Sequence, residues 1–110
     1  NKALGDAVID EGSRYGIYPF VIALRDVKTL DEAFLFPTTL NTYQHGVLEN
    51  YRNDPRMVEC KHIRAMEMNL KIVYFGDHKT LKPLTEHFEK TFGEELEYKL
   101  SPEKYSDGWF

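Results

Sequence analysis

Residues 70–92 read LKIVYFGDHKTLKPLTEHFEKTF, and this stretch predicts a buried strand, a tight turn and an amphipathic helix in succession. Residues 72–75 are all β-branched or aromatic, which suits a largely buried strand, and Gly76 ends the run. Beyond the turn, one apolar stripe recurs at steps of three and four residues: Leu81, Leu84, Phe88 and Phe92. With Thr80 as N-cap, Pro83 falls in the first turn, where its missing N–H costs no hydrogen bond. Gly93 then fits just beyond the helix C-terminus.

Length and composition favour one globular domain spanning residues 1–110. A chain of 110 residues buries roughly two-thirds of the surface that its unfolded form exposes, which suits one core. Hydrophobic residues make up 42% of the chain and charged residues 29%, as in globular proteins. Eighteen acidic residues against fourteen basic ones give a formal charge of −4, which argues against binding to nucleic acid. This charge either suits a basic protein partner or, as we favour, only keeps a small protein soluble.

The single cysteine, Cys60, excludes an internal disulfide and a multi-cysteine zinc site. No apolar run approaches the roughly 20 residues that a membrane-spanning helix needs, and no signal-peptide pattern is evident. We therefore expect a cytoplasmic protein without a membrane contact.

The first forty residues predict a helix, a strand and a second helix. Residues 2–12 carry apolar side chains at helical spacing up to Gly12. Residues 20–24 are apolar and read as a strand, with Pro19 at its start. Thr29 and Glu32 have the spacing of a capping box, which predicts a short helix through Phe34 that Pro37 stops.

The rest of the chain completes a predicted α+β fold. Residues 40–51 show helical spacing and end at the Asn-Asp-Pro of 53–55, whereas residues 57–75 alternate in polarity as a strand does. Nineteen residues are long for one strand, so we expect either two strands with a turn near 67–69 or one strongly bent strand. Residues 96–100 alternate again. This order predicts a ferredoxin-like split βαβ arrangement, an antiparallel sheet with its helices on one face, preceded by a short N-terminal helix.

Few residues have the spacing of a catalytic or metal site. Cys60 and His62 share a predicted strand face, but nothing completes a ligand set, so we expect neither a metal nor a cofactor. Asp77 and His78 follow the central strand, where ligands often gather, and form the alternative ligand site together with His62. A catalytic pair of Cys60 with His78 or His87 stays open, because such partners are close only in space. No glycine-rich phosphate loop occurs, which disfavours nucleotide hydrolysis. Because no catalytic constellation is evident in the sequence, an enzyme is the less favoured interpretation and no catalytic residue is assigned.

The tail holds the candidate partner-binding residues Tyr105, Asp107, Trp109 and Phe110. Large aromatic side chains in a terminal segment either fold back on the core, which we favour, or form an exposed anchor of the kind found at interface hot spots.

Residues 70–92, followed by LEYKLSP at 96–102 and YSDGWF at 105–110, resemble small bacterial α/β domains of uncharacterised function. The Asp-Gly-Trp piece resembles the RraB-type protein regulators of ribonuclease E, although the acidic run typical of those regulators is missing here. The resemblance implies regulation by binding and points to Asp107 and Trp109.

Two functions follow as hypotheses. The first is a non-enzymatic module that binds another protein as regulator, inhibitor, immunity protein or assembly subunit, and that can also self-associate through unpaired sheet edges. The second is a small enzyme or ligand sensor that uses the Asp77-His78 end of the central strand.

Overall fold

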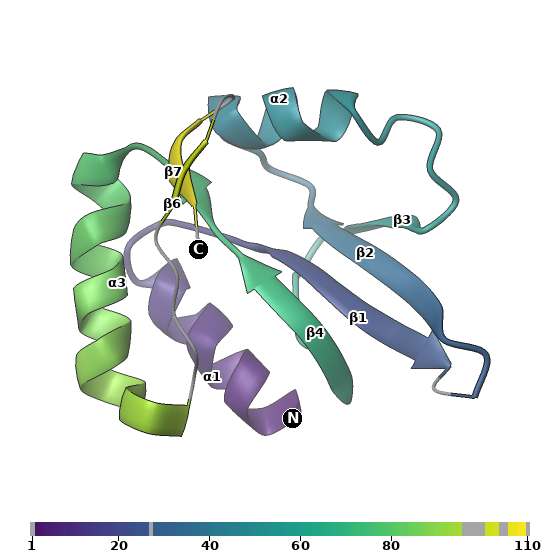
Figure 1. Cartoon of the computed structure of the whole chain (residues 1–110), viewed down its shortest axis with the longest axis horizontal. Coiled ribbons are helices and arrows are strands. Elements are labelled where there is room, and N and C mark those ends of the chain that lie inside the picture. The colour runs from purple at the N-terminus through teal and green to yellow at the C-terminus, as the bar shows by residue number, and fades with distance from the viewer. Residues whose placement is uncertain (1, 27, 96–100, 104–105, 110) are drawn as a thin grey trace.

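The protein has an α+β fold built on a four-stranded mixed sheet and three helices (Figure 1). The computed structural model describes residues 2–26, 28–95, 101–103 and 106–109. In chain order the elements are α1 (Lys2–Ser13), β1 (Phe20–Asp26), β2 (Asp31–Pro37), α2 (Thr42–Glu49), β3 (Met57–Cys60), β4 (Met68–Val73), β5 (Phe75–Gly76), α3 (His78–Phe92), the 3-10 helix η1 (Gly93–Glu95), β6 (Ser101–Glu103) and β7 (Ser106–Trp109).

The main sheet has the strand order β3-β2-β1-β4. β1 runs antiparallel to both of its neighbours, whereas β2 and β3 are parallel and are joined through α2. A second, three-stranded sheet has the order β5-β7-β6. The described strands therefore do not follow the predicted ferredoxin-like order, and the main sheet is mixed where an antiparallel one was expected.

The prediction of a helix from the capping box at 29–32 is wrong, because residues 31–37 form β2 instead. β1 and β2 make an antiparallel hairpin in which Ala23 pairs with Ala33 and Val21 with Leu35. Leu30 turns the chain with a positive φ of 57°. A helix N-cap is worth about 1 kcal/mol, less than burying several apolar side chains of a paired strand, so pairing with β1 overrides the local signal.

The alternating stretch 57–75 is divided into β3 and β4, with Phe75 beginning the short β5, so it is not one bent strand, and the turn predicted near 67–69 is wrong. Met68 and Asn69 already belong to β4, and residues 61–67 connect the strands. β3 and β4 lie at opposite edges of the main sheet rather than side by side. The connection therefore crosses the sheet, where α1 also packs.

Helix α1 is present as predicted and joins two hydrophobic clusters. The α1–sheet cluster lies between α1, one sheet face and the connection 61–67, and comprises Ile9, Val21, Ala23, Ala33, Leu35, Ile63 and Ala65. The α1–α3 cluster comprises Val8, Ile17, Tyr74, Leu81, Leu84 and Phe88. Ile72 packs against both clusters. On the opposite sheet face, ring contacts of Phe20 with Phe34 and of Phe34 with Tyr51 cover the end of the sheet nearest α2.

Helix α3 has the predicted apolar stripe and the predicted C-terminus, with Gly93 at a positive φ of 55°. Its start differs: Asp77 is the N-cap and accepts a hydrogen bond from the Thr80 backbone N–H at 2.8 Å, so the assignment of Thr80 as N-cap is wrong. Pro83 consequently lies in the second turn of the helix, not in the first. The strand predicted over 96–100 falls outside the described residues.

Candidate functional site

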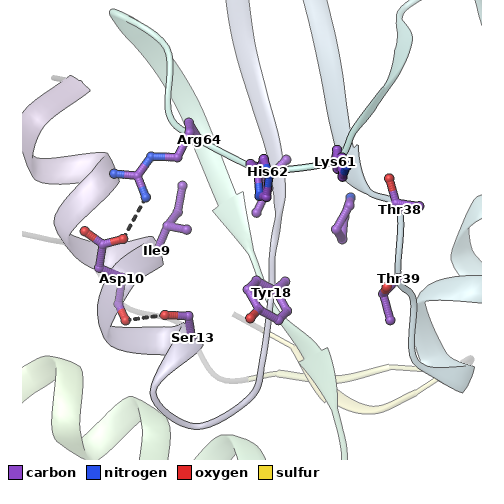
Figure 2. A pocket seen from close by; sticks show the side chains of 11 residues that line it. Ile9, Asp10, Ser13, Tyr18, Thr38, Thr39, Lys61, His62 and Arg64 are labelled. Atoms are coloured by element: carbon purple, nitrogen blue, oxygen red, sulfur yellow. Dashed lines mark hydrogen bonds and ion pairs between the residues drawn. The ribbon is translucent and has the colours of Figure 1, made fainter.

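A pocket forms where the parallel strands β2 and β3 end. Pro37 and Cys60 pair at the last position of the two strands, and the Thr38 N–H continues the pattern by donating to the Cys60 carbonyl at 3.1 Å. Parallel strands that are neighbours end at the same edge, so the residues that follow them are brought together. Thr38 and Thr39 on one side and Lys61 and His62 on the other therefore line one opening (Figure 2).

Helix α1 and the segment after it form the other walls. Ile9, Asp10 and Ser13 face the pocket from α1, and Tyr18 lies at the end opposite to the 61–64 segment (Figure 2). The pocket has a volume of about 380 Å³. Proteins bind small molecules in pockets of roughly 300–1,000 Å³. This space is therefore large enough for a small organic molecule.

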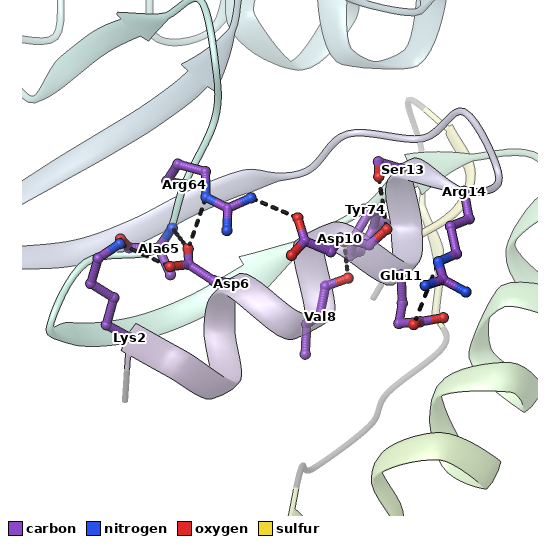
Figure 3. Close-up of polar contacts among 10 residues, drawn as sticks. All are labelled: Lys2, Asp6, Val8, Asp10, Glu11, Ser13, Arg14, Arg64, Ala65 and Tyr74. Atoms are coloured by element: carbon purple, nitrogen blue, oxygen red, sulfur yellow. Dashed lines mark hydrogen bonds and ion pairs between the residues drawn. The ribbon is translucent and has the colours of Figure 1, made fainter.

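A polar clamp holds the 61–64 segment against α1 (Figure 3). Asp6 accepts the Ala65 backbone N–H at 2.8 Å and forms ion pairs with Lys2 at 2.9 Å and with Arg64 at 3.3 Å. Lys2 in turn donates to the Ala65 carbonyl at 2.9 Å, and Arg64 pairs with Asp10 at 2.6 Å. The segment that carries Lys61 and His62 is thus fixed by both backbone and side-chain contacts.

The charges of the clamp neutralise one another. Partial burial opposes ionisation of Asp6, but the hydrogen bonds from Lys2 and Ala65 and the charge of Arg64 outweigh it and lower the pKa of this carboxyl. The hydrogen bond to Asp10 raises the pKa of Arg64. Among the described residues, no carboxylate lies within ion-pair distance of Lys61. The pocket therefore carries a net positive charge on a chain whose formal charge is −4.

The structure separates the residues of the predicted alternative ligand site. His62 lines the pocket, whereas Asp77 caps α3 and is not part of the pocket lining. His78 is the first residue of α3. The sequence did not single out Lys61, Thr38 or Thr39 as site residues, because each is an ordinary polar residue in its local pattern.

Cys60 and His87 have separate environments. Cys60 packs against the α1–sheet cluster, and its burial raises the pKa of the thiol above the ordinary value, which disfavours the reactive thiolate. The imidazole Nε2 of His87 lies 2.7 Å from Glu11 Oε2, between α1 and α3. No contact joins these two side chains in the described part of the chain.

The backbone of the tail pairs with β5, the short strand that follows β4. In β7 and β5, Trp109 pairs with Phe75 and Gly108 with Gly76, so Asp107 also lies in a paired strand. Tyr105 and Phe110 fall outside the described residues.

A second surface lies on the sheet face opposite α1. Val21 and Ala23 point toward α1, so Ile22 and Leu24, which alternate with them, face the other way. Leu24 pairs with Met68 of β4, which is 46% exposed, and Ile22 and Leu24 are half-buried. We call Ile22, Leu24 and Met68 the open sheet face. In Figure 1 this hairpin end of β1 and β2 extends away from the three helices.

In the described ranges, no three side chains from His, Cys, Asp and Glu gather closely enough to hold a metal ion. None of the helices in that part of the chain combines the length and apolarity needed to cross a membrane. Comparison of the chain with protein-family models, with curated proteins and with solved structures found no match.

Proposed function

We propose that this chain is a non-enzymatic module that binds another protein through the open sheet face. The observation that carries the proposal is the direct pairing of Leu24 with the 46%-exposed Met68 on a face that the described helices leave uncovered at its hairpin end. An exposed apolar side chain beside half-buried ones on a sheet face favours a protein contact, because covering them removes apolar area from water.

The occupant we propose is an amphipathic helix with basic flanking residues, supplied by a different protein. Glu32 pairs with Leu24 across the hairpin and so lies on the same face, and Asp26 and Asp31 follow at its end. Arg56, Arg25 and Lys71, which pairs with Ile22 on the same face, offset this local charge, but the chain as a whole carries a formal charge of −4. A basic partner is attracted by this charge, whereas a second copy of the chain is repelled by it.

The decisive measurement is the affinity of a purified partner for two matched variants. A protein captured from the source lysate is produced in pure form, and its binding to wild type, Met68→Asp and Tyr15→Asp is measured by calorimetry. Tyr15 is the control because it is 47% exposed but lies outside the open sheet face. We expect Met68→Asp to weaken binding by about 2 kcal/mol, the effect of losing an interface hot spot, and Tyr15→Asp to leave the affinity unchanged.

Equal affinity of wild type and Met68→Asp would remove the open sheet face from the proposal. Sedimentation of the chain alone tests the competing occupant, since a dimer that Met68→Asp dissociates would identify a second copy as the partner.

The tail offers a second contact for the same function. The resemblance to RraB-type regulators supports Asp107 and Trp109 as partner-binding residues, with Tyr105 and Phe110 beside them in sequence. A partner that is lost with Trp109→Ala but retained by Met68→Asp would place the interface on the tail. The alternative function, a small enzyme or ligand sensor at Asp77 and His78, is the less favoured proposal, because the Asp77 carboxylate accepts the Thr80 N–H as the N-cap of α3.

A further inference from the structure

We propose that the pocket at the ends of β2 and β3 binds a small organic anion, a carboxylate or phosphate carried on an apolar ring. This proposal is independent of the protein contact on the open sheet face. It rests on the placement of Lys61 and His62 beside two threonine hydroxyls, over apolar side chains.

The charges around the pocket favour an anionic ligand. The carboxylate that borders the pocket, Asp10, is held by Arg64 at 2.6 Å, and Asp6, four residues earlier in α1, is paired with Lys2 and Arg64. Because of these pairs, the Lys61 ammonium is the charged group of the pocket that has no carboxylate partner among the described residues. An anion that enters the pocket gains a charge-assisted hydrogen bond from Lys61, a stronger interaction than one between neutral groups.

The hydrogen-bond donors of the pocket favour the same chemistry. Thr38 and Thr39 each bring a hydroxyl group, and Tyr18 brings a phenol. Hydroxyl groups can donate to carboxylate or phosphate oxygens. The Ser13 hydroxyl is already committed, because it donates to the Asp10 carbonyl at 2.7 Å.

The C-terminal end of α1 borders the pocket, and a helix C-terminus by itself repels anions. Its last carbonyls are occupied in this protein. The carbonyls of Glu11, Gly12 and Ser13 accept backbone N–H groups from the turn that follows, at 2.9–3.2 Å. The α1 C-terminus therefore repels an anion bound at Lys61 only weakly.

The remaining walls of the pocket favour an apolar ring on the ligand. Ile9 and Ile63, which are 2% and 5% exposed, line the pocket, and so does Pro37. The Tyr18 ring, which is 43% exposed, closes one end. A flat ring on the ligand can cover these side chains while its anionic group reaches Lys61. The volume of about 380 Å³ admits one such ring with its substituent.

The test uses benzoate and phenyl phosphate as probes, with benzamide as the neutral analogue and inorganic phosphate as the anion without a ring. Each is titrated to about 10 mM into the full chain while the backbone amides are followed by NMR, a range that detects binding as weak as millimolar. We expect benzoate and phenyl phosphate to shift the amides of Thr38, Thr39, Lys61 and His62 together. Benzamide and inorganic phosphate should bind at least about tenfold more weakly.

Two variants locate the charge. Lys61→Met keeps the apolar stem but removes the ammonium. We expect this substitution to lower the affinity for both anions by about tenfold or more. Lys82→Met on the exposed side of α3 is the matched control and should leave the affinity unchanged. Absence of shifts with both anions, equal binding of benzoate and benzamide, or unchanged affinity in Lys61→Met would each overturn the proposal. Equal binding of inorganic phosphate and phenyl phosphate would overturn its apolar half.

Discussion

At the scale of single residues, Gly12 is where α1 comes closest to the α1–α3 cluster. A Cβ atom added to Gly12 would lie 2.5 Å from the Tyr74 hydroxyl oxygen and 2.8 Å from its ring atom Cε1. The Tyr74 ring cannot easily retreat, because it is buried and its hydroxyl donates to the Val8 carbonyl at 3.2 Å. Burial also raises the pKa of this phenol. Glycine is therefore required at position 12 by the close approach of a ring.

Gly12→Ala should destabilise the protein by about 1–3 kcal/mol, because an inserted methyl group overpacks the site and outweighs the gain in helix propensity. Gly46→Ala is the matched control, since Gly46 also lies in a helix but nothing is within 4 Å of an added Cβ. It should stabilise by about 0.5–1 kcal/mol. Urea unfolding of both variants measures the difference, and effects of equal sign would contradict the packing at Tyr74.

Asp54 gives a pH-dependent prediction at the same scale. Its hydrogen bonds from Arg56 lower the pKa of the carboxyl from 3.8 to about 2. A lowered pKa in the folded state stabilises the protein above pH 4, and this contribution is lost as the pH falls to about 2. Urea midpoints between pH 5 and 2 should therefore fall more steeply in wild type than in Asp54→Asn. Parallel curves would show that Asp54 is unperturbed in solution.

At the scale of elements, α3 shows how a helix start is decided. Both Asp77 and Thr80 are residue types that cap helices, and the proline three residues beyond Thr80 favoured the later start. In the structure the Asp77 side chain accepts the Thr80 N–H, which adds most of a turn before Pro83. Pro83 cannot donate the hydrogen bond that the Lys79 carbonyl would receive in a regular helix. Packing of Leu81 in the α1–α3 cluster favours the longer helix.

Asp77→Ala should destabilise the protein by about 1 kcal/mol, the usual effect of removing an N-cap, while Thr80→Ala should cost clearly less. Urea unfolding with amide hydrogen exchange at Thr80 and Leu81 compares the two. A larger loss in Thr80→Ala would restore the start that the sequence predicts.

At the scale of the whole molecule, α1 and Ile72 connect the two hydrophobic clusters. Val8 belongs to the α1–α3 cluster and Ile9 to the α1–sheet cluster, although they are adjacent in sequence. Ile72 of β4 packs against both. Shared side chains of this kind should couple the stability of the sheet to that of α3.

Ile72→Ala should therefore lower the stability of both clusters together, by about 2–4 kcal/mol. The measurement follows NMR signals of β2 and of α3 through a urea titration. Coincident midpoints that shift together are expected, whereas a loss confined to one cluster would show that the two unfold separately.

The sequence by itself determined the elements whose signals are local. The apolar stripe of α3 and the glycine after it, the helical spacing of α1 and the apolar run of β1 all depend on neighbours within one or two turns, and all are present. The charge of −4 and the single cysteine are likewise properties of the sequence alone.

Tertiary structure decided the state of residues 31–37, the placement of β3 and β4 at opposite sheet edges, and the pocket. Strand pairing joins residues far apart in sequence, so the burial gained by pairing β2 with β1 is invisible to a capping-box pattern at 29–32. For the same reason Thr38 and Lys61, which are ordinary polar residues in sequence, become neighbours only because their two strands are parallel and end at one edge.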